Sequence, residues 1–541
     1  EMLHAETFLP NFRQGDAIIL YERNCDTDNV TNKMVFKGNI EYLTENEIGI
    51  RLRATQQNPS VLPAESLYAI EHDTMDTTFR SMYQGLYIYL SARKERRDLL
   101  LSQRPPRFDE SLDSMISRSE DDFTRIALKA KAAQDYFLLI GPPGTGKTSC
   151  ALKKMVETFH ADKDAQILLL SYTNRAVDEI CKSLASIAPA VDFIRVGSEL
   201  SCDETYRGHL IENELSSCNR RSEVYERIRN CRIIVGTVAA ISGKPELFRL
   251  KHFDVAIIDE ATQILEPQLL GILCARGEDG KDAIDKFVLI GDHKQLPAVV
   301  QQNTEQSAIY DESLLSIGLT NLKDSLFERL YRNCTATVHR SYDMLCRQGR
   351  MHPEVALFAN RAFYGGRLIP VGLPHQIESS DTICRLAFYP SVPEKAGASA
   401  KINYSEARIV ADLAVRIYED HQTDFDESRT LGIITPYRSQ IALIKKEIES
   451  LGIPALNRIL VDTVERFQGS ERDVIIYSFC VNYPYQLKFL SNLTEEEGVL
   501  IDRKLNVALT RARKQMFITG VPELLERNPL YKSLLKLIER F

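Results

Sequence analysis

Eight consecutive residues of the sequence have the composition of a loop that holds phosphate groups. They follow an apolar run at 137–140 and precede a helical pattern. They are Gly141, Pro142, Pro143, Gly144, Thr145, Gly146, Lys147 and Thr148. The glycines allow backbone N–H groups to converge on phosphate oxygens, Lys147 adds a cation, and the Thr148 hydroxyl can bind Mg²⁺. The segment therefore predicts a nucleoside-triphosphate site.

Two acidic residues are candidates for the other half of such a site. Asp259 and Glu260 directly follow the apolar run 255–258. Asp259 is predicted to hold Mg²⁺ together with Thr148, and Glu260 to polarise the attacking water. An acidic pair after a strand is often only a solvated cap. Beside a phosphate loop, however, it favours hydrolysis of a nucleoside triphosphate.

Three polar side chains further along the chain are candidates for stabilising the transition state of hydrolysis. Gln295 lies in a short motif after another apolar run, where it could reach the γ-phosphate, although a structural turn explains the motif equally well. Arg350 and Arg511 lie much later. If they face the phosphate loop from another domain, hydrolysis depends on closure of a cleft. Isolated arginines usually form surface ion pairs, so these two are supported mainly by the order of the motifs.

Short apolar runs alternate with helical patterns over most of the chain, as is typical of buried parallel strands. One set lies at 137–140, 167–170, 233–235, 255–258 and 287–290, and a second at 431–434, 459–461, 474–477 and 515–518. Two α/β units in tandem are the simplest account. We place them at 119–334, with a helical insertion at about 198–230, and at 335–541.

The N-terminal part has a different pattern of apolar and polar residues. Residues 1–75 show short alternating strands separated by Asn, Asp and Gly, which predicts a small β-barrel. Residues 76–118 turn helical, with six basic residues against two acidic ones between Ser91 and Arg107. Such a charge run is usually a solvated helix face.

Composition narrows the class of protein. The 541 residues are 44% hydrophobic and 26% charged, with a net charge of -8, which excludes bulk disorder and a globally basic coat for nucleic acid. Eleven scattered cysteines lack metal-binding or iron–sulfur spacing and favour reduced thiols in a soluble cytoplasmic (nucleoid-associated) or nuclear protein. No apolar run could span a bilayer, so we expect no membrane partner. The start at Glu1 suggests a piece of a longer chain.

The order and spacing of these motifs resemble the superfamily 1B helicases over nearly the whole chain. The likeness is to the branch of the nonsense-mediated-decay RNA helicase and, more closely, the replication nuclease-helicase that trims DNA flaps. Besides the residues above, it rests on segments 171–178, 235–237, 325–329, 348–353, 434–438, 463–469 and 505–513. The resemblance implies two RecA-like P-loop domains, an N-terminal barrel on a helical stalk, and ATP with Mg²⁺ in the cleft.

The resemblance also implies an activity and further contacts. It implies an ATP-dependent helicase or translocase on single-stranded nucleic acid, with DNA and 5′-to-3′ movement favoured. Glu471 would help to bind nucleotide, and the strand contacts would be Asn174, Thr237, Pro436 and Thr463. Two alternatives stay open: an RNA helicase or ribonucleoprotein remodeller, since 2′-hydroxyl contacts cannot be placed from sequence, and a nucleotide-dependent interaction switch without unwinding. A nuclease activity is not expected of this segment.

Two positions depart from the family pattern. Thr124 stands where family members carry a glutamine that reads adenine, and Gly349 where an aromatic residue precedes the arginine. We therefore expect weak discrimination among ATP, GTP and other nucleoside triphosphates. The chain has no Trp, so any base stacking must come from Tyr or Phe.

Overall fold

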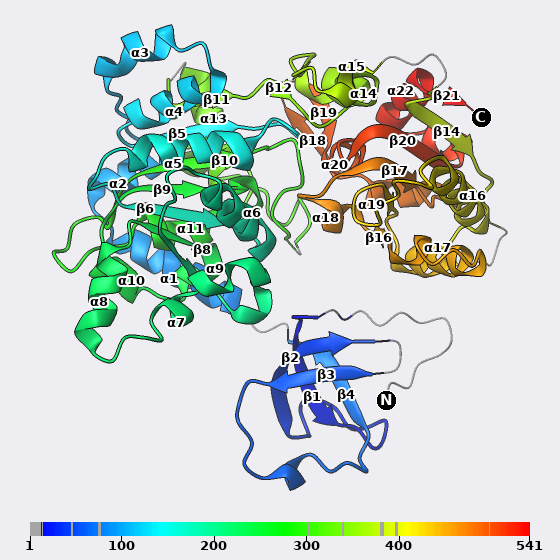
Figure 1. The fold of residues 1–541 in the computed structure, drawn as a ribbon, viewed down its shortest axis with the longest axis horizontal. Helices are drawn as coiled ribbons and strands as arrows, with labels where there is room; N and C mark the ends of the chain where they lie inside the picture. The colour runs from blue at the N-terminus through cyan, green and yellow to red at the C-terminus, as the bar shows by residue number, and fades with distance from the viewer. Residues whose placement is uncertain are drawn as a thin grey trace.

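The computed structural model describes residues 12, 14–44, 47–73, 77–300, 302–337, 340–378, 383–394, 399–496 and 498–540. Figure 1 shows two α/β units side by side, with a small antiparallel sheet below them. Within these described ranges, no helix combines the length and the apolar character that crossing a membrane requires. Residues 1–11 of the predicted barrel lie outside the described residues.

The first unit is built on a seven-stranded parallel sheet in the order β11-β5-β10-β9-β6-β8-β7. Its strands are β5 (Tyr136–Ile140), β6 (Ile167–Ser171), β7 (Phe193–Val196), β8 (Ile233–Thr237), β9 (Phe253–Ile258), β10 (Ile284–Gly291) and β11 (Tyr342–Met344). One face packs against α4 (Asp122–Ala132), α5 (Lys153–His160) and α6 (Asn174–Ala185). The other face packs against α9 (Val238–Ser242), α10 (Glu246–Leu250), α11 (Glu266–Leu273) and α13 (Leu326–Thr337). Burial on both faces explains the continuous apolar runs.

The second unit has a six-stranded parallel sheet in the order β16-β15-β17-β20-β14-β21. Its strands are β14 (Leu386–Pro390), β15 (Leu431–Ile434), β16 (Leu460–Asp462), β17 (Arg472–Ser478), β20 (Ala512–Gly520) and β21 (Glu539–Arg540). One face packs against α16 (Tyr404–Asp420) and α17 (Arg438–Ser450), and the other against α14 (Pro353–Tyr364), α20 (Arg503–Leu509) and α22 (Pro529–Leu537). The predicted α/β fold with parallel sheets is confirmed.

One strand lies on the other side of the predicted boundary. We assigned residues from 335 onward to the second unit, yet β11 pairs in parallel with β5 at the edge of the first sheet. The segment Tyr-Asp-Met is short and carries a charge, so it lacks the apolar run that marks the other strands. The chain therefore leaves the first sheet only after Met344. Between β7 and β8 it forms short helical turns and α8 (Arg221–Asn230).

The N-terminal sheet is antiparallel and four-stranded, in the order β3-β2-β1-β4. Its strands are β1 (Ala17–Glu22), β2 (Val35–Leu43), β3 (Ile48–Leu52) and β4 (Tyr68–His72). Three helices follow, namely α1 (Thr77–Ser91), α2 (Lys94–Leu100) and α3 (Asp113–Arg118). The assignment of these parts as barrel and stalk stays a prediction.

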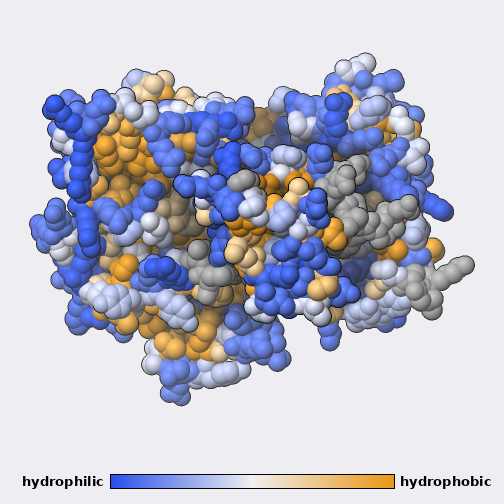
Figure 2. All heavy atoms as spheres, turned by 90° about the horizontal axis from the view of Figure 1, so that it is seen from below, coloured by the Kyte–Doolittle hydropathy of each residue, from blue (hydrophilic) through white to orange (hydrophobic). Residues whose placement is uncertain are grey.

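Helix α1 lies unusually close to the first unit. A Cβ placed on Gly85 would lie 2.2 Å from the carbonyl oxygen of Pro267 in α11, so only glycine permits this approach. The outward side of α1 instead exposes large apolar residues, namely Phe79, Tyr83, Leu86, Tyr87 and Leu90. Figure 2, which views the molecule from below, shows hydrophobic residues gathered on the side of the first unit.

The basic run after α1 is a solvated face only in part: Lys94 is exposed, as expected, but other basic residues are held by aspartates of the first unit. Arg93 and the buried Arg96 both form ion pairs with Asp282, at 2.6 and 3.5 Å. Arg104 and Arg107 likewise share the buried carboxylate of Asp135, at 2.8 and 2.9 Å. Two aspartates of the first unit thus hold this segment, a pairing between residues far apart in sequence that a local charge count cannot find.

Candidate active site

The phosphate loop follows β5 at the carboxyl edge of the first sheet. Gly144 and Gly146 adopt φ values of +73° and +76°, a region that favours glycine. Gly141 is required for another reason, because a Cβ there would lie 2.0 Å from Cγ of Lys147. The absence of side chains at these positions lets the loop fold around the Lys147 side chain.

The two acidic residues lie beside this loop. The Thr148 hydroxyl donates to Asp259 Oδ2 at 2.5 Å, and Lys147 Nζ lies 3.2 Å from Glu260 Oε1. Glu260 has φ +53°, a strained conformation for a residue with a side chain, which aims its carboxylate at the lysine. The strand β9 thus ends with its two carboxylates at the loop.

Burial shifts the ionisation of both carboxylates. Burial, together with the charge of Glu260, raises the pKa of Asp259 to about 6. Burial also acts to raise the pKa of Glu260, but the Lys147 ammonium, the hydrogen bond from Gln263 and the charge of Arg511 together outweigh it, so the pKa of Glu260 is lowered. A hydroxyl and a carboxylate are oxygen ligands of the kind that Mg²⁺ prefers, and a cation would relieve the cost of the buried Asp259 charge. The residues present therefore fit Mg²⁺.

Arg350 of the second unit lies against the phosphate loop. The Gly349 amide donates to the carbonyl oxygen of Gly144 at 2.8 Å, and a Cβ on Gly144 would lie 2.4 Å from Cβ of Arg350. Arg350 Nε donates to Glu471 Oε2 at 2.6 Å, which brings this predicted nucleotide ligand to the same place. The contact between units is therefore made by main chain as well as by side chains.

Arg511, at the end of α20, meets the first unit through Gln295. Its Nη2 donates to Gln295 Oε1 at 3.2 Å, and it forms no ion pair with any residue in the described parts of the chain. Burial, with repulsion from Arg350, lowers the pKa of Arg511 to about 9. A buried cation without a carboxylate is costly, and a phosphate beside it would offset that cost.

Known proteins and family models match most of this chain. Two family models, each described as an AAA domain, match the chain, one over residues 117–217 and 211–303 and the other over residues 322–523. The "DNA replication ATP-dependent helicase/nuclease DNA2" of Gallus gallus is 29% identical over 88% of this chain and 45% of its own length. The Bos taurus protein of the same name is 27% identical over 97% of this chain and 49% of its own. The chain belongs to the Upf1/Dna2-like branch of the superfamily 1B helicases.

Other relatives of this helicase chain differ in how much of them it covers. It spans about half the length of the helicase/nucleases above. The "DNA polymerase alpha-associated DNA helicase A" of Saccharomyces cerevisiae is 24% identical over 86% of this chain and 74% of its own length. A solved complex of an arterivirus nonstructural protein 10 helicase with DNA aligns at 15% identity and a TM-score of 0.37, covering 75% of this chain and 65% of that one. The fold described above rests on strand topology and not on this last likeness.

The four predicted strand contacts lie at the same edge of the two sheets. Asn174 begins α6 after β6, and Thr237 ends the neighbouring strand β8, where its hydroxyl accepts the Ala240 amide at 3.1 Å. Pro436 and Thr463 follow β15 and β16, which also pair with one another. In this helicase the four residues therefore occupy equivalent places in the two units, at the carboxyl ends of adjacent strands.

The two departures from the family pattern have a structural counterpart. The Thr124 hydroxyl donates to Asp121 Oδ2 at 2.5 Å, so it supports the start of α4 and is not left free to read a base. At Gly349, a Cβ would meet Leu373 and Val371 at 3.3 and 3.4 Å. A side chain at that position would therefore crowd the segment after β13 (Ile369–Pro370), whose side chains would have to shift.

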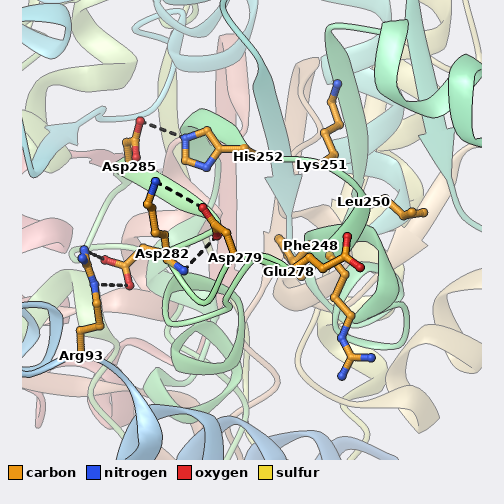
Figure 3. Close-up of a pocket in the computed structure, with 12 residues that line it drawn as sticks. Arg93, Phe248, Leu250, Lys251, His252, Glu278, Asp279, Asp282 and Asp285 are labelled. Carbon is orange, nitrogen blue, oxygen red and sulfur yellow. Dashed lines mark hydrogen bonds and ion pairs between the residues drawn. The ribbon is translucent and has the colours of Figure 1, made fainter.

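A pocket of the first unit lies away from this chemistry. Its residues lie near the starts of β9 and β10, opposite to the ends that carry the carboxylates. Figure 3 shows two ion pairs in it, Arg93 with Asp282, and His252 with Asp285 at 3.0 Å. It therefore offers no counterpart to the phosphate loop.

Sequence reasoning missed three polar residues at the contact between the units. Tyr364 and Asn506 of the second unit, both buried, bond with the loop that carries Asp292. No local pattern distinguishes Tyr364 from other tyrosines at the end of an amphipathic helix. Asp292 did carry a signal, because it directly follows a predicted strand beside Gln295.

Proposed function

We propose that this chain hydrolyses ATP to move along single-stranded DNA, from 5′ to 3′, and to separate duplexes. The observation that carries the proposal is the meeting of two units at one phosphate loop, with Lys147 and Glu260 on one side and Arg350 and Arg511 on the other. The relatives are named as DNA helicases, which favours DNA as the strand. The direction of movement rests on the family resemblance alone.

The residues around the loop define a reaction sequence. The loop amides and Lys147 bind the phosphates, and Glu260, ionised at neutral pH, accepts the proton of the water that attacks the γ-phosphorus. The bond to the ADP oxygen breaks, and Arg350 and Arg511 neutralise the developing charge only while the second unit lies against the first. When bound, Mg²⁺ would be held by Thr148 and Asp259 and would polarise the phosphate oxygens.

Movement follows from the loss of these contacts. Once the γ-phosphate leaves, the two arginines lose the anion that drew the units together, and the cleft reopens. We propose Asn174 and Thr237 in the first unit, and Pro436 and Thr463 in the second, as the strand contacts. Alternating grip by the two sets would then advance the strand.

Two variants test the hydrolysis step. Glu260→Gln should bind ATP as the unaltered protein does but lose at least about 100-fold in turnover, since it cannot accept the proton. Arg511→Ala should lose about 1,000-fold, the scale of an arginine that stabilises phosphoryl transfer. Arg458→Ala, which removes an exposed ion pair with Glu427, is the matched control and should be unaffected. Normal hydrolysis by Arg511→Ala would overturn the interdomain model.

The strand dependence of turnover separates the alternatives. We expect ATP hydrolysis to rise on addition of single-stranded DNA more than on addition of RNA of the same sequence. A greater rise with RNA would favour an RNA helicase, whereas turnover indifferent to either strand would favour an interaction switch.

We also propose that base selection is weak. Because the Thr124 hydroxyl is engaged by Asp121, no glutamine amide stands at the position that reads adenine in the family. ATP hydrolysis should then be inhibited almost equally by GTP, CTP and UTP. A strong preference for ATP in this competition assay would refute the proposal.

The remaining assignments are accessory to this function. We propose that residues 1–75 form a barrel and 76–118 a stalk beside the two ATP-binding units, and that the protein acts in a nucleoid or a nucleus. The replication helicase names of the relatives support this location.

A further inference from the structure

Four consecutive residues of the first unit, Asp292 to Gln295, each contact the second unit. The contacts are Tyr364 OH to Asp292 Oδ2 at 2.7 Å, His293 Nε2 to Glu496 Oε2 at 3.0 Å, Lys294 Nζ to the Phe363 carbonyl at 2.8 Å, Asn506 Nδ2 to the Lys294 carbonyl at 2.7 Å, and Arg511 Nη2 to Gln295 Oε1 at 3.2 Å. The active-site hydrogen bond between Gln295 and Arg511 is thus the last of a continuous set.

The buried carboxylate of Asp292 is the centre of this set. Its Oδ2 accepts from the Tyr364 hydroxyl at 2.7 Å and from Gln295 Nε2 at 2.8 Å. Asn506 donates to the Tyr364 oxygen at 2.8 Å, which leaves the tyrosine proton directed at Asp292. One oxygen atom therefore links a tyrosine of the second unit to the glutamine that faces Arg511.

Apart from Glu496 of β18 (Leu493–Glu496), the groups that reach across lie on two helices of the second unit or directly beside them. Helix α14 begins just after Arg350 and ends at Tyr364, whereas α20 contains Asn506 and ends just before Arg511. The two helices pack against one another in the core of the second unit. Because they move together, the contact between Tyr364 and Asp292 forms and breaks with the approach of the two arginines.

We propose that Tyr364 is a positioning residue that sets Gln295 for hydrolysis only when the two units are together. Acting through Asp292, its hydroxyl holds the Gln295 amide so that Oε1 faces Arg511. When the units separate, Asp292 loses this donor and Gln295 loses its fixed orientation. The inference rests on the proposed ATPase function and adds a residue to it that contacts neither the nucleotide loop nor the arginines directly.

Tyr364→Phe tests the inference by removing one hydroxyl and keeping the ring. We expect kcat for ATP hydrolysis in the presence of single-stranded DNA to fall by about tenfold or more, and KM for ATP to change by less than about twofold. Tyr531→Phe is the matched control, because its buried hydroxyl donates to Asp502 at 2.9 Å wholly within the second unit. Both variants should lower the thermal midpoint, but only Tyr364→Phe should lower kcat.

A second variant covers the case in which Tyr364→Phe fails to fold. Asn506→Asp keeps the volume but replaces the donor to Tyr364 by an acceptor, which draws the tyrosine proton away from Asp292 and should lower kcat. It also removes the bond to the Lys294 carbonyl, so Asn506→Ala, which removes both bonds without redirecting the tyrosine proton, is its control and should lower kcat less. Unchanged kcat in the folded variants, or an equal fall in Tyr531→Phe, would overturn the inference. If the unaltered protein hydrolyses no ATP, the proposed function fails as well. If both the unaltered protein and Tyr364→Phe hydrolyse ATP at the same rate, only the inference is overturned.

Discussion

Replacing Gly144 by alanine is expected to slow hydrolysis by forcing the phosphate loop away from the second unit. The new Cβ would lie 2.4 Å from Cβ of Arg350, whereas carbon atoms in contact lie about 3.5–4.0 Å apart. The loop and Arg350 must therefore separate by more than about 1 Å. A displacement of this size at a reacting centre costs about 100-fold in rate, or about 2.7 kcal/mol of barrier.

The backbone strain of the substitution needs its own control. Gly144 has φ +73°, so alanine there costs roughly 1–2 kcal/mol even without the collision. Gly146→Ala carries the same strain at φ +76°, but its Cβ would meet Cys150 at 3.2 Å, inside the first unit. The difference in kcat between the two variants therefore measures the effect of the contact between the units.

The assay is kcat for ATP hydrolysis with single-stranded DNA, together with the Kd of a non-hydrolysable ATP analogue. Both variants should weaken nucleotide binding to a similar degree, while kcat should fall about 100-fold further in Gly144→Ala than in Gly146→Ala. An equal fall in the two variants would refute the reasoning, because the loss would then come from loop strain alone.

Three further predictions concern stability and specificity. Burial raises the pKa of Glu406 to about 7, so the folded protein holds a proton that the unfolded chain releases above pH 4.5. This group should lower the free energy of unfolding by up to about 3 kcal/mol as pH rises from about 5 to about 8. Urea titrations should show the pH dependence shrink by this amount in Glu406→Gln, while the part due to Asp259 remains. Gly85→Ala should lower the thermal midpoint because its Cβ would lie 2.2 Å from the Pro267 carbonyl, whereas Gly208→Ala, with open space around it, should not; equal midpoints would contradict the close helix contact. Thr124→Gln should raise the preference for ATP over GTP by about tenfold in competition assays, and an unchanged preference would show that this position does not face the base.

Most of the parallel strands that sequence reasoning found are buried on both faces. Val255 to Ile258 and Val474 to Tyr477 are continuous apolar runs because helices cover both sides of their sheets. Strand β7 was missed because Arg195 interrupts it; the arginine is buried through an ion pair with Asp178, a partner that the local pattern does not reveal. Edge strands such as β11 are too short to leave a period of their own.

The residues of the candidate site were also predicted only in part. Lys147, Thr148 and Asp259 were found because each directly follows a buried strand or belongs to a contiguous loop. The residues missed act through a contact that only folding creates, since Tyr364 and Asp292 come from different units. Spacing in sequence carries no trace of such a pair.

The place of β11 gives the two arginines unequal freedom. This strand is hydrogen-bonded to β5, the Leu345 amide donates to the Ile140 carbonyl at 2.9 Å, and only a few residues later comes Arg350. Even fully extended, the segment between β11 and Arg350 keeps the Arg350 main chain within about 20 Å of β11. Arg511 directly precedes β20 inside the second sheet, so no comparably short segment ties it to the first sheet. If the two units separate, Arg511 can therefore move farther from the phosphate loop than Arg350 can.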